Sequence, residues 1–320
     1  MQAIERLGKA GLIPVVVVES VEDALQCAKA LLDAGLDVME ITMRTSAGID
    51  AIRAVSEAYP SMLTGAGTVL TVEKAKEAVD AGAQFIVSPG FSPEVVAWCI
   101  DNQVPVTPGC VTPSEITQAL SYGLKVLKFF PADVYGGIKG CKALYGPFQS
   151  ANVRFIPTGG INNDNLAEFA DKPFIHAIGG GFLCNPADVK KRDFAAITTA
   201  AQKAISTLLG FELAHIGINA RHENESMDIT NAFSRAFGFG VKEGNSSNFA
   251  GTGIEVNKAP GLGEKGHIAI RTNSIDRASY YLQKRGFEVD MDTAKYKGDK
   301  MIAVYLKDEL GGFAVHLLQK

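Results

Sequence analysis

One lysine stands inside an apolar run, Leu127-Lys128-Phe129-Phe130-Pro131. Runs that are apolar on both faces are typical of strands in parallel sheets that helices cover. Burying an unpaired ammonium group is costly, so the neutral amine is favoured at such a position. A neutral amine in a dry pocket attacks carbonyl groups to form a Schiff base. The alternative interpretation is a lysine at the end of a strand whose ammonium group reaches water.

The sequence on both sides of this lysine alternates between short apolar runs and amphipathic segments up to about residue 210. The expected strands are Ile13–Val18, Asp37–Thr42, Leu63–Ala66, Gln84–Val87, Val104–Thr107, Lys125–Phe130, Val153–Pro157 and Ile175–Ile178. A single last helix is expected over Pro186–Leu209. Strands that alternate with helices predict a parallel sheet, and eight units of this length predict a closed (β/α)₈ barrel. An open doubly wound sheet is less favoured, because no Gly-x-Gly-x-x-Gly follows the first strand.

The pattern changes after Gly210, and we therefore expect two domains, residues 1–210 and 211–320. Two similar segments begin at His215 and His267, and each reads as strand, helix and three short strands. A sheet this short cannot bury its apolar face alone, so the two βαβββ modules should pack together. The sequence thus predicts a barrel followed by a smaller α+β domain.

Composition indicates a globular protein of the cytoplasm. The net charge is −4, which gives no reason to expect binding to nucleic acid or to an anionic membrane. The five cysteines are scattered, without a Cys-x-x-Cys pair, so a disulfide framework or a cysteine zinc site is not expected. The apolar run Leu12–Val18 is too short to span a bilayer.

In a barrel, side chains at the carboxyl ends of the strands converge on one mouth. The second strand places Glu40 in an apolar alternation, which suits a general acid–base, with Arg44 just beyond it. A purely structural Glu40–Arg44 ion pair is the alternative. The third strand ends at glycines followed by Thr68, which offers a hydroxyl group. Glycine-rich loops after the seventh and eighth strands are typical of phosphate binding through backbone N–H groups.

These residues lie in motifs that resemble a known family. The motifs are Val38-Met39-Glu40-Ile41-Thr42-Met43-Arg44-Thr45, Gly65-Ala66-Gly67-Thr68-Val69-Leu70, Ser88-Pro89-Gly90, Lys128-Phe129-Phe130-Pro131-Ala132 and Pro157-Thr158-Gly159-Gly160-Ile161. In this order they are similar to the bacterial 2-keto-3-deoxy-6-phosphogluconate / 4-hydroxy-2-oxoglutarate aldolases, over nearly all of residues 1–209. The resemblance implies a class I aldolase that needs no metal or other cofactor, acts on a small keto acid and assembles as a homotrimer.

The same resemblance implies a role for each matched residue. Lys128 would form the Schiff base with the C2 ketone, and Glu40 would be the general acid–base that moves the C4 hydroxyl proton. The residues expected to bind substrate are Arg44 and Thr68 at the carboxylate, Pro89 and Phe130 in the pocket wall, Gly159, Gly160, Gly180 and Gly181 at the distal phosphate, and Thr158 beside them.

One departure from the family concerns the loop after the eighth strand. The family commonly has serine where this chain has Gly181. A hydroxyl donor to a charged group is worth about 1.5–3 kcal/mol. A shorter, unphosphorylated keto acid is therefore an alternative substrate.

In the second domain, strand alternation places four potential metal ligands on the face opposite the isoleucines. They are His215, Glu255, His267 and His316, at matching positions of the two modules. Such a set suits Zn²⁺, Ni²⁺ or a similar divalent ion, while the alternative is a cleft lined by four polar groups. The paired modules resemble the glyoxalase / vicinal-oxygen-chelate superfamily, whose last ligand is commonly glutamate. That resemblance implies a metal-dependent isomerase or lyase; a small-ligand-binding or assembly module is the alternative.

Overall fold

The computed structural model describes residues 3–320, which form two units, the first extending to Leu208 and the second covering Leu209–Lys320. The second unit begins two residues before the expected boundary. The reason lies in the carbonyl group of Leu209, which accepts hydrogen bonds from the Thr272 hydroxyl (2.7 Å) and the Asn273 N–H (2.9 Å). Both hydrogen bonds lie within the second unit.

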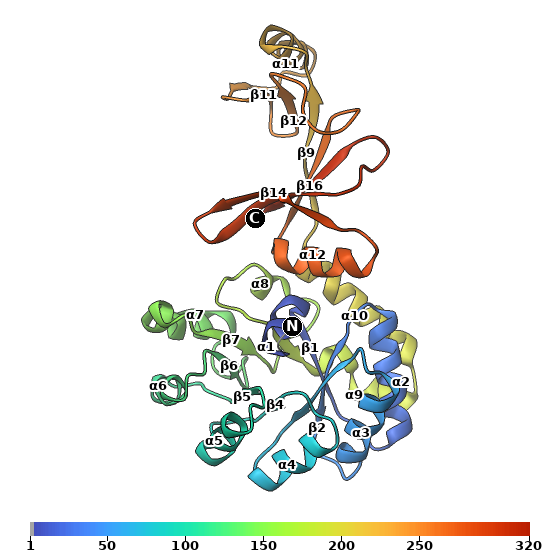
Figure 1. The fold of residues 1–320 in the computed structure, drawn as a ribbon, viewed down its shortest axis with the longest axis vertical. Coiled ribbons are helices and arrows are strands. Elements are labelled where there is room, and N and C mark those ends of the chain that lie inside the picture. The colour runs from blue at the N-terminus through green and yellow to red at the C-terminus, as the bar shows by residue number, and fades with distance from the viewer. Residues whose placement is uncertain (1–2) are drawn as a thin grey trace. The chain divides into compact units, whose positions relative to one another are not determined.

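Eight parallel strands alternate with helices in the first unit. The strands are β1 (Leu12–Val16), β2 (Val38–Thr42), β3 (Leu63–Gly67), β4 (Ile86–Val87), β5 (Val106–Thr107), β6 (Val126–Phe129), β7 (Arg154–Pro157) and β8 (Ile178–Gly180). The helices are α1 (Ala3–Ala10), α2 (Val21–Asp33), α3 (Gly48–Ala58), α4 (Val72–Asp80), α5 (Pro93–Asp101), α6 (Pro113–Ser121), α7 (Gly137–Phe148), α8 (Ala167–Ala170), α9 (Pro186–Lys191) and α10 (Phe194–Leu209), with the 3₁₀ turns η1 (Gln149–Ala151) and η2 (Gly181–Cys184). Figure 1 shows α2 to α7 on the outside of the strands.

Hydrogen bonds connect these strands side by side. Six follow the order β5-β4-β3-β2-β1-β8, and β6 pairs with β7. Single parallel bridges join Gly109 to Lys128 and Thr158 to Gly179, which link the chain after β5 to β6 and the chain after β7 to β8. Each described strand of this unit therefore has a parallel neighbour on both sides. All carboxyl ends then lie at one edge, where the expected site residues stand.

Local sequence explains most of these elements. Ser20, Thr71, Ser92 and Thr112 each accept a hydrogen bond from the backbone at the start of a helix, and Thr112 forms a capping box with Glu115. Strands β2 and β6 are buried over their whole length, as expected for strands that helices cover. The charged residues Glu40 and Lys128 are thereby taken out of water.

The bounds of several strands differ from the prediction, β4 and β5 being only two residues long, and two larger differences concern the end of the unit. The expected last helix is two helices, α9 and α10, because Arg192 adopts a left-handed backbone conformation (φ 58°) between them. Strand β8 begins at Ile178 rather than Ile175, which forms only a single bridge to Phe155. The shift places Gly180 within the strand and Gly181 just after it, in η2.

The second unit is one mixed sheet with two helices. Its elements are β9 (Glu212–Asn219), α11 (Glu223–Phe237), β10 (Val241–Glu243), β11 (Ser247–Ala250), β12 (Ile254–Asn257), β13 (His267–Thr272), α12 (Ile275–Lys284), β14 (Val289–Lys297), β15 (Lys300–Leu306) and β16 (Ala314–Gln319). The strand order is β10-β11-β12-β9-β13-β16-β15-β14. Each half has the order βαβββ, and the antiparallel β9–β13 pair joins the halves edge to edge. The two halves thus form one continuous eight-stranded sheet.

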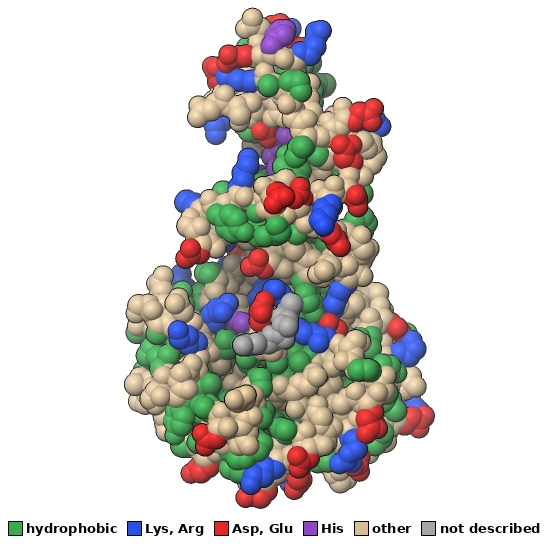
Figure 2. Space-filling model, in the orientation of Figure 1, with side chains coloured by type: hydrophobic (Ala, Val, Ile, Leu, Met, Phe, Trp, Pro, Cys, Tyr) green, Lys and Arg blue, Asp and Glu red, His purple; other side chains and the backbone are tan. Residues whose placement is uncertain are grey.

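Surface character agrees with the low net charge. Basic and acidic side chains are interspersed over the face drawn in Figure 2. Among residues 3–320, the helices are too short or too polar to cross a membrane.

Candidate functional site

The buried lysine and the buried glutamate meet. Lys128 Nζ in β6 lies 3.3 Å from Glu40 Oε1 in β2, although 88 residues separate them in the chain. Their side chains are only 7% and 4% exposed. The lysine is therefore not unpaired, as its own strand suggested it to be. Because desolvation offsets most of the attraction within a buried ion pair, such a pair adds little to stability, and a chemical role is the better explanation for it.

A glycine in the neighbouring strand makes room for this carboxylate. A Cβ atom at Gly67 would lie 2.2 Å from Glu40 Oε1 and 2.8 Å from its Cδ. Gly67 stands beside Thr42 in the β2–β3 register. On the other side of the pair, Lys128 Nζ lies 5.3 Å from the ring centroid of Phe130, which is 36% exposed. The amine therefore lies near both a carboxylate and an aromatic ring.

The residues expected at the substrate carboxylate and in the pocket wall follow the ends of β2, β3 and β4. Arg44 is exposed in the turn after β2, and no ion pair joins it to Glu40 among the described residues. Thr68 directly follows β3 with φ 59°, a left-handed conformation that costs energy for a threonine and is often kept at functional sites. Pro89 follows β4, and its carbonyl oxygen would lie 2.0 Å from a Cβ at Gly109, so both turns pack closely.

The expected phosphate side contains a buried hydroxyl group. Thr158 is 5% exposed, and its Oγ1 has no hydrogen-bond partner among the described residues. A Cβ at Gly179 would lie 2.3 Å from that oxygen. Gly159 and Gly160 both have positive φ angles (98° and 69°), a backbone that glycine adopts readily. Asp133, which sequence reasoning did not single out, lies beside Gly160, where a Cβ would be 2.6 Å from Asp133 Oδ2.

Comparison with known proteins identifies the family of the first unit. Residues 3–200 match the family model "KDPG and KHG aldolase". The chain belongs to this aldolase family. It is 45% identical over 201 residues to the 2-dehydro-3-deoxy-phosphogluconate aldolase of Treponema pallidum, covering 63% of this chain and 95% of that protein. It is 41% identical over 195 residues to the KHG/KDPG aldolase of Escherichia coli, covering 61% and 90% of the two chains.

The structure of a related aldolase with a covalent intermediate indicates the class of reaction. The KDPG aldolase of Legionella pneumophila, with pyruvate captured as a covalent carbinolamine, is 35% identical, has a TM-score of 0.61 and is matched over 64% of this chain and 98% of that one. The first unit thus has an aldolase-type α/β fold. We call it the aldolase unit. It is a class I carbon–carbon lyase. The family match ends at residue 200, before the C-terminal unit begins.

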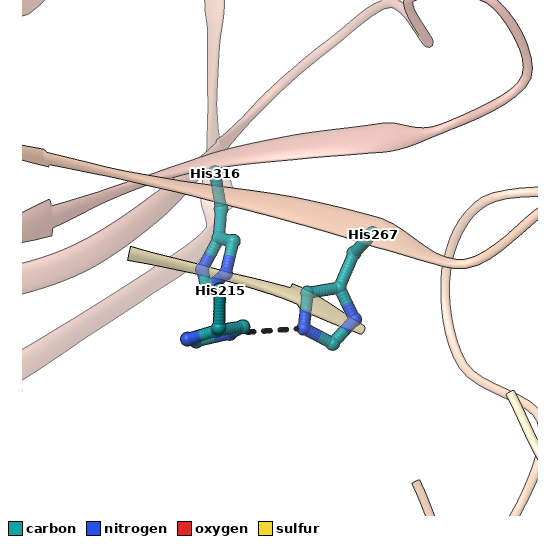
Figure 3. Close-up of side chains that lie close together, drawn as sticks. All are labelled: His215, His267 and His316. Atoms are coloured by element: carbon teal, nitrogen blue, oxygen red, sulfur yellow. Dashed lines mark hydrogen bonds between the residues drawn. The ribbon is translucent and has the colours of Figure 1, made fainter. Parts of the chain in front are cut away.

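The C-terminal unit gathers the four side chains that strand alternation placed on one face. His215 Nε2 lies 2.8 Å from Glu255 Oε2 and 3.2 Å from His267 Nε2, and His267 Nε2 lies 3.4 Å from the same carboxylate oxygen. The ligand atoms of His215, His267 and His316 all lie within 4.8 Å of one another. Figure 3 shows the three rings on neighbouring strands, with the His215 and His267 nitrogens facing each other.

Electrostatics keep the carboxylate charged and one histidine neutral. Burial by itself would raise the pKa of Glu255, but hydrogen bonds from His215, His267 and Ser247 outweigh it and hold that pKa well below its ordinary value. Burial first, and then His267 and His215, lower the pKa of His316 to about 4. Its ring is therefore neutral at pH 7. An anionic carboxylate beside imidazole nitrogens is a donor set that fits a divalent cation.

Three further residues shape this cluster and were not singled out from the sequence. The Tyr305 ring stacks on His316, with centroids 4.6 Å apart and planes 13° apart. Ser247 lowers the pKa of Glu255. Gly217 pairs with His267 across β9 and β13, and a Cβ there would lie 1.9 Å from the His267 ring. Each of these contacts depends on how neighbouring strands are aligned, which the pattern of a single strand in the sequence does not reveal.

Proposed function

We propose that the aldolase unit cleaves 2-keto-3-deoxy-6-phosphogluconate to pyruvate and glyceraldehyde 3-phosphate, 4-hydroxy-2-oxoglutarate to pyruvate and glyoxylate, or both. The names of the similar aldolases support these substrates. The single observation that carries the roles is the buried contact of 3.3 Å between Lys128 Nζ and Glu40 Oε1. A primary amine next to a carboxylate, both on buried strands, supports the roles of nucleophile and proton acceptor. In this proposal the ring of eight strands is a (β/α)₈ barrel.

The reaction then proceeds through covalent catalysis by Lys128. The neutral amine attacks the C2 ketone, and loss of water from the carbinolamine gives an iminium ion. Glu40 accepts the proton of the C4 hydroxyl group, directly or through a water, while the C3–C4 bond breaks and its electron pair moves into the iminium to form an enamine. The aldehyde leaves. Protonation of the enamine at C3 and hydrolysis of the resulting iminium release pyruvate and restore Lys128.

The remaining expected residues bind the rest of the substrate. Arg44 and Thr68 hold the carboxylate, and Arg44 suits a bidentate contact. Phe130 and Pro89 form the pocket wall. The distal group of the substrate is held by Thr158, Gly159, Gly160, Gly180 and Gly181. Gly181 offers the phosphate only a backbone N–H, without the hydroxyl group of a serine. The preference for the phosphorylated over the unphosphorylated substrate should therefore be weaker than in an aldolase with serine in this loop. We also propose that the protein assembles as a homotrimer, which light scattering of the purified chain tests.

Borohydride trapping tests the proposed mechanism. Pyruvate and borohydride should leave one reduced pyruvyl adduct, located on Lys128 by peptide mass spectrometry. Lys128→Ala should remove the adduct, whereas Lys125→Ala, a change to an exposed lysine near the start of the same strand, should keep it. A folded, pyruvate-exposed protein without an adduct on Lys128 would refute the Schiff-base role.

A second candidate function concerns the C-terminal unit. We propose that His215, Glu255, His267 and His316 form a centre for a divalent metal ion such as Zn²⁺ or Ni²⁺. The separations of 2.8, 3.2 and 3.4 Å among three donor atoms carry this proposal. The ion would supply Lewis-acid chemistry for an isomerase or lyase, or would anchor a small ligand. The paired βαβββ modules support a place in the glyoxalase / vicinal-oxygen-chelate superfamily. Metal analysis after dialysis of the purified chain against Zn²⁺ or Ni²⁺ should find one ion per chain, and none in Glu255→Ala.

A further inference from the structure

Charged side chains are distributed unevenly around the expected substrate site of the aldolase unit. We propose that this unit also cleaves 2-keto-3-deoxy sugar acids that carry no phosphate, and that Asp133 makes the distal end of the site favour a neutral, hydroxylated group over a phosphate. The C3–C4 bond breaks as in the proposed mechanism, and the products are pyruvate and an uncharged hydroxyaldehyde. This inference rests on the proposed aldolase function and names a substrate class for the same site.

Four neighbouring loops form the expected distal end of the site. Strand β6 pairs with β7, a bridge from Thr158 to Gly179 joins β7 to β8, and β8 pairs with β1, so the loops that follow these strands lie side by side. The loops are residues 130–136, 158–166, 181–185 and 17–20. None of them contains a lysine or an arginine, and their charged side chains, all exposed, are those of Asp133, Asp164 and Glu19. A phosphate dianion would therefore meet carboxylates in these loops and no cation.

The Asp133 carboxylate lies against the glycine turn after β7. A Cβ atom at Gly160 would lie 2.3 Å from Asp133 Cβ and 2.6 Å from Asp133 Oδ2. The Val134 N–H donates a hydrogen bond of 2.9 Å to Oδ1, and no hydrogen bond to Oδ2 is formed among residues 3–320. Oδ2 can therefore accept a hydrogen bond from a substrate hydroxyl group, whereas a dianion beside it would be repelled.

A buried hydroxyl group next to this turn is independent evidence for a hydroxylated ligand. Thr158 is 5% exposed, and its Oγ1 has no hydrogen-bond partner among the described residues. A buried hydroxyl group without a protein partner calls for one from solvent or from a ligand. Space is free after β8, because a Cβ atom at Gly181 would meet only the Val15 carbonyl oxygen, at 3.8 Å. A substrate hydroxyl group can donate to Asp133 and accept from Thr158, whereas a phosphate dianion can only accept.

Two substrates that differ only in the phosphate test the inference. They are 2-keto-3-deoxy-6-phosphogluconate and the same sugar acid without its phosphate. In the unchanged full chain, kcat/KM for the unphosphorylated acid should equal or exceed that for the phosphorylated acid. Because salt screens the repulsion between exposed charges, the ratio of the two values should move about threefold toward the phosphorylated acid between about 0.01 M and about 1 M salt. A preference of more than about tenfold for the phosphorylated acid would overturn the inference.

Asp133→Asn keeps the size of the side chain and removes its charge. The value of kcat/KM for the phosphorylated acid should rise about tenfold, and the salt dependence of the ratio should weaken. The value for the unphosphorylated acid should change less than about threefold, because an amide oxygen still accepts a hydrogen bond. Asp80→Asn, at the exposed end of α4 and thus at the opposite edge of the strands, is the matched control. An unchanged ratio in Asp133→Asn would refute the role of Asp133.

Pyruvate trapping separates failure of this inference from failure of the proposed function. A chain that forms the adduct on Lys128 but cleaves only the phosphorylated acid, or only 4-hydroxy-2-oxoglutarate, would refute the inference and leave the proposed function standing. A chain that forms no adduct and cleaves none of the three acids would refute both. Equal adduct formation in Asp133→Asn and in the unchanged protein establishes that the variant is folded, so that its substrate ratio reports on the distal end.

Discussion

Each unit of this protein places a strand glutamate against nitrogen atoms from other strands, and the two clusters differ in the kind of nitrogen. Glu40 meets a primary amine, Lys128, at 3.3 Å, while Glu255 meets two imidazoles, His215 and His267, at 2.8 and 3.4 Å. A primary amine forms covalent bonds with carbonyl carbon. Neutral imidazoles are ligands for metal ions. We therefore propose proton transfer for the carboxylate of the aldolase unit and metal binding for the carboxylate of the other unit.

Both clusters also depend on a glycine in an adjacent strand. A Cβ at Gly67 would lie 2.2 Å from Glu40 Oε1, and one at Gly217 would lie 1.9 Å from Cε1 of His267. The Glu40 carboxylate is at the end of a flexible side chain and can turn away. The His267 imidazole is a rigid ring that is 4% exposed. Alanine at Gly67 should therefore displace the Glu40 carboxylate, whereas alanine at Gly217 should collide with the His267 ring.

The largest effect is expected for Lys128→Ala. Loss of the nucleophile should lower the rate of aldol cleavage by about 10³-fold or more, because no other described group lies in its place. Steady-state cleavage assays measure the effect, with Lys125→Ala as control. Co²⁺ binding should be unchanged. A residual activity above a tenth of the original would contradict the role given to Lys128.

Glu40→Gln should be the next most severe change. The amide keeps the size of the side chain but cannot accept a proton, so the cleavage rate should fall by about 10²–10⁴-fold. The pyruvyl adduct on Lys128 should still form in the trapping experiment. Glu57→Gln, at an exposed position of α3, is the control. Full activity with glutamine at position 40 would remove Glu40 from the mechanism.

Gly67→Ala should act only through the position of Glu40. Displacement of the carboxylate by about 1 Å should reduce kcat by about 10²-fold. Thermal unfolding should change little, because the flexible carboxylate moves rather than the backbone. Gly146→Ala in α7, where a Cβ meets open space, is the matched control. An unfolded Gly67→Ala protein would mean that the glycine serves the strand and not the site.

Gly217→Ala is the corresponding change in the C-terminal unit. The methyl group should push the His267 ring away and weaken Co²⁺ binding by about tenfold or more. Aldol cleavage should stay at its original rate. Gly253→Ala, in the same unit with open space around the Cβ, should affect neither property. Equal metal affinity in the Gly217→Ala and Gly253→Ala variants would mean that His267 is not a metal ligand.

The smallest effect on cleavage is expected from a chelator. EDTA should change the aldolase rate less than twofold, as judged by the same assay, because covalent catalysis by Lys128 needs no ion. Metal at about a hundred times its Kd should in contrast stabilise the C-terminal unit by about 2.7 kcal/mol, and EDTA should reverse this. Denaturant unfolding, followed separately for each unit with and without EDTA, measures this stabilisation of the C-terminal unit. A chelator-sensitive aldolase would contradict the division of roles.

Much of the aldolase unit could be predicted from the sequence. Apolar runs separated by capped helices indicated eight strand–helix units, and the strand of Lys128 is buried as its composition predicts. Strand alternation also placed His215, Glu255, His267 and His316 on one face. These inferences succeed because the periodicity of side chains along a strand or helix is a local property of the chain.

The tertiary structure decided what those side chains meet. Glu40 pairs with Lys128, 88 residues away, and not with Arg44, four residues away in the sequence. The hydrogen bond between Thr272 and Leu209 places the start of the second unit, and Tyr305 packs on His316 from a neighbouring strand. The cluster of His215, His267 and His316 likewise arises where strands from both modules meet. Such contacts depend on the register and stagger of strands far apart in the chain, which no single strand encodes.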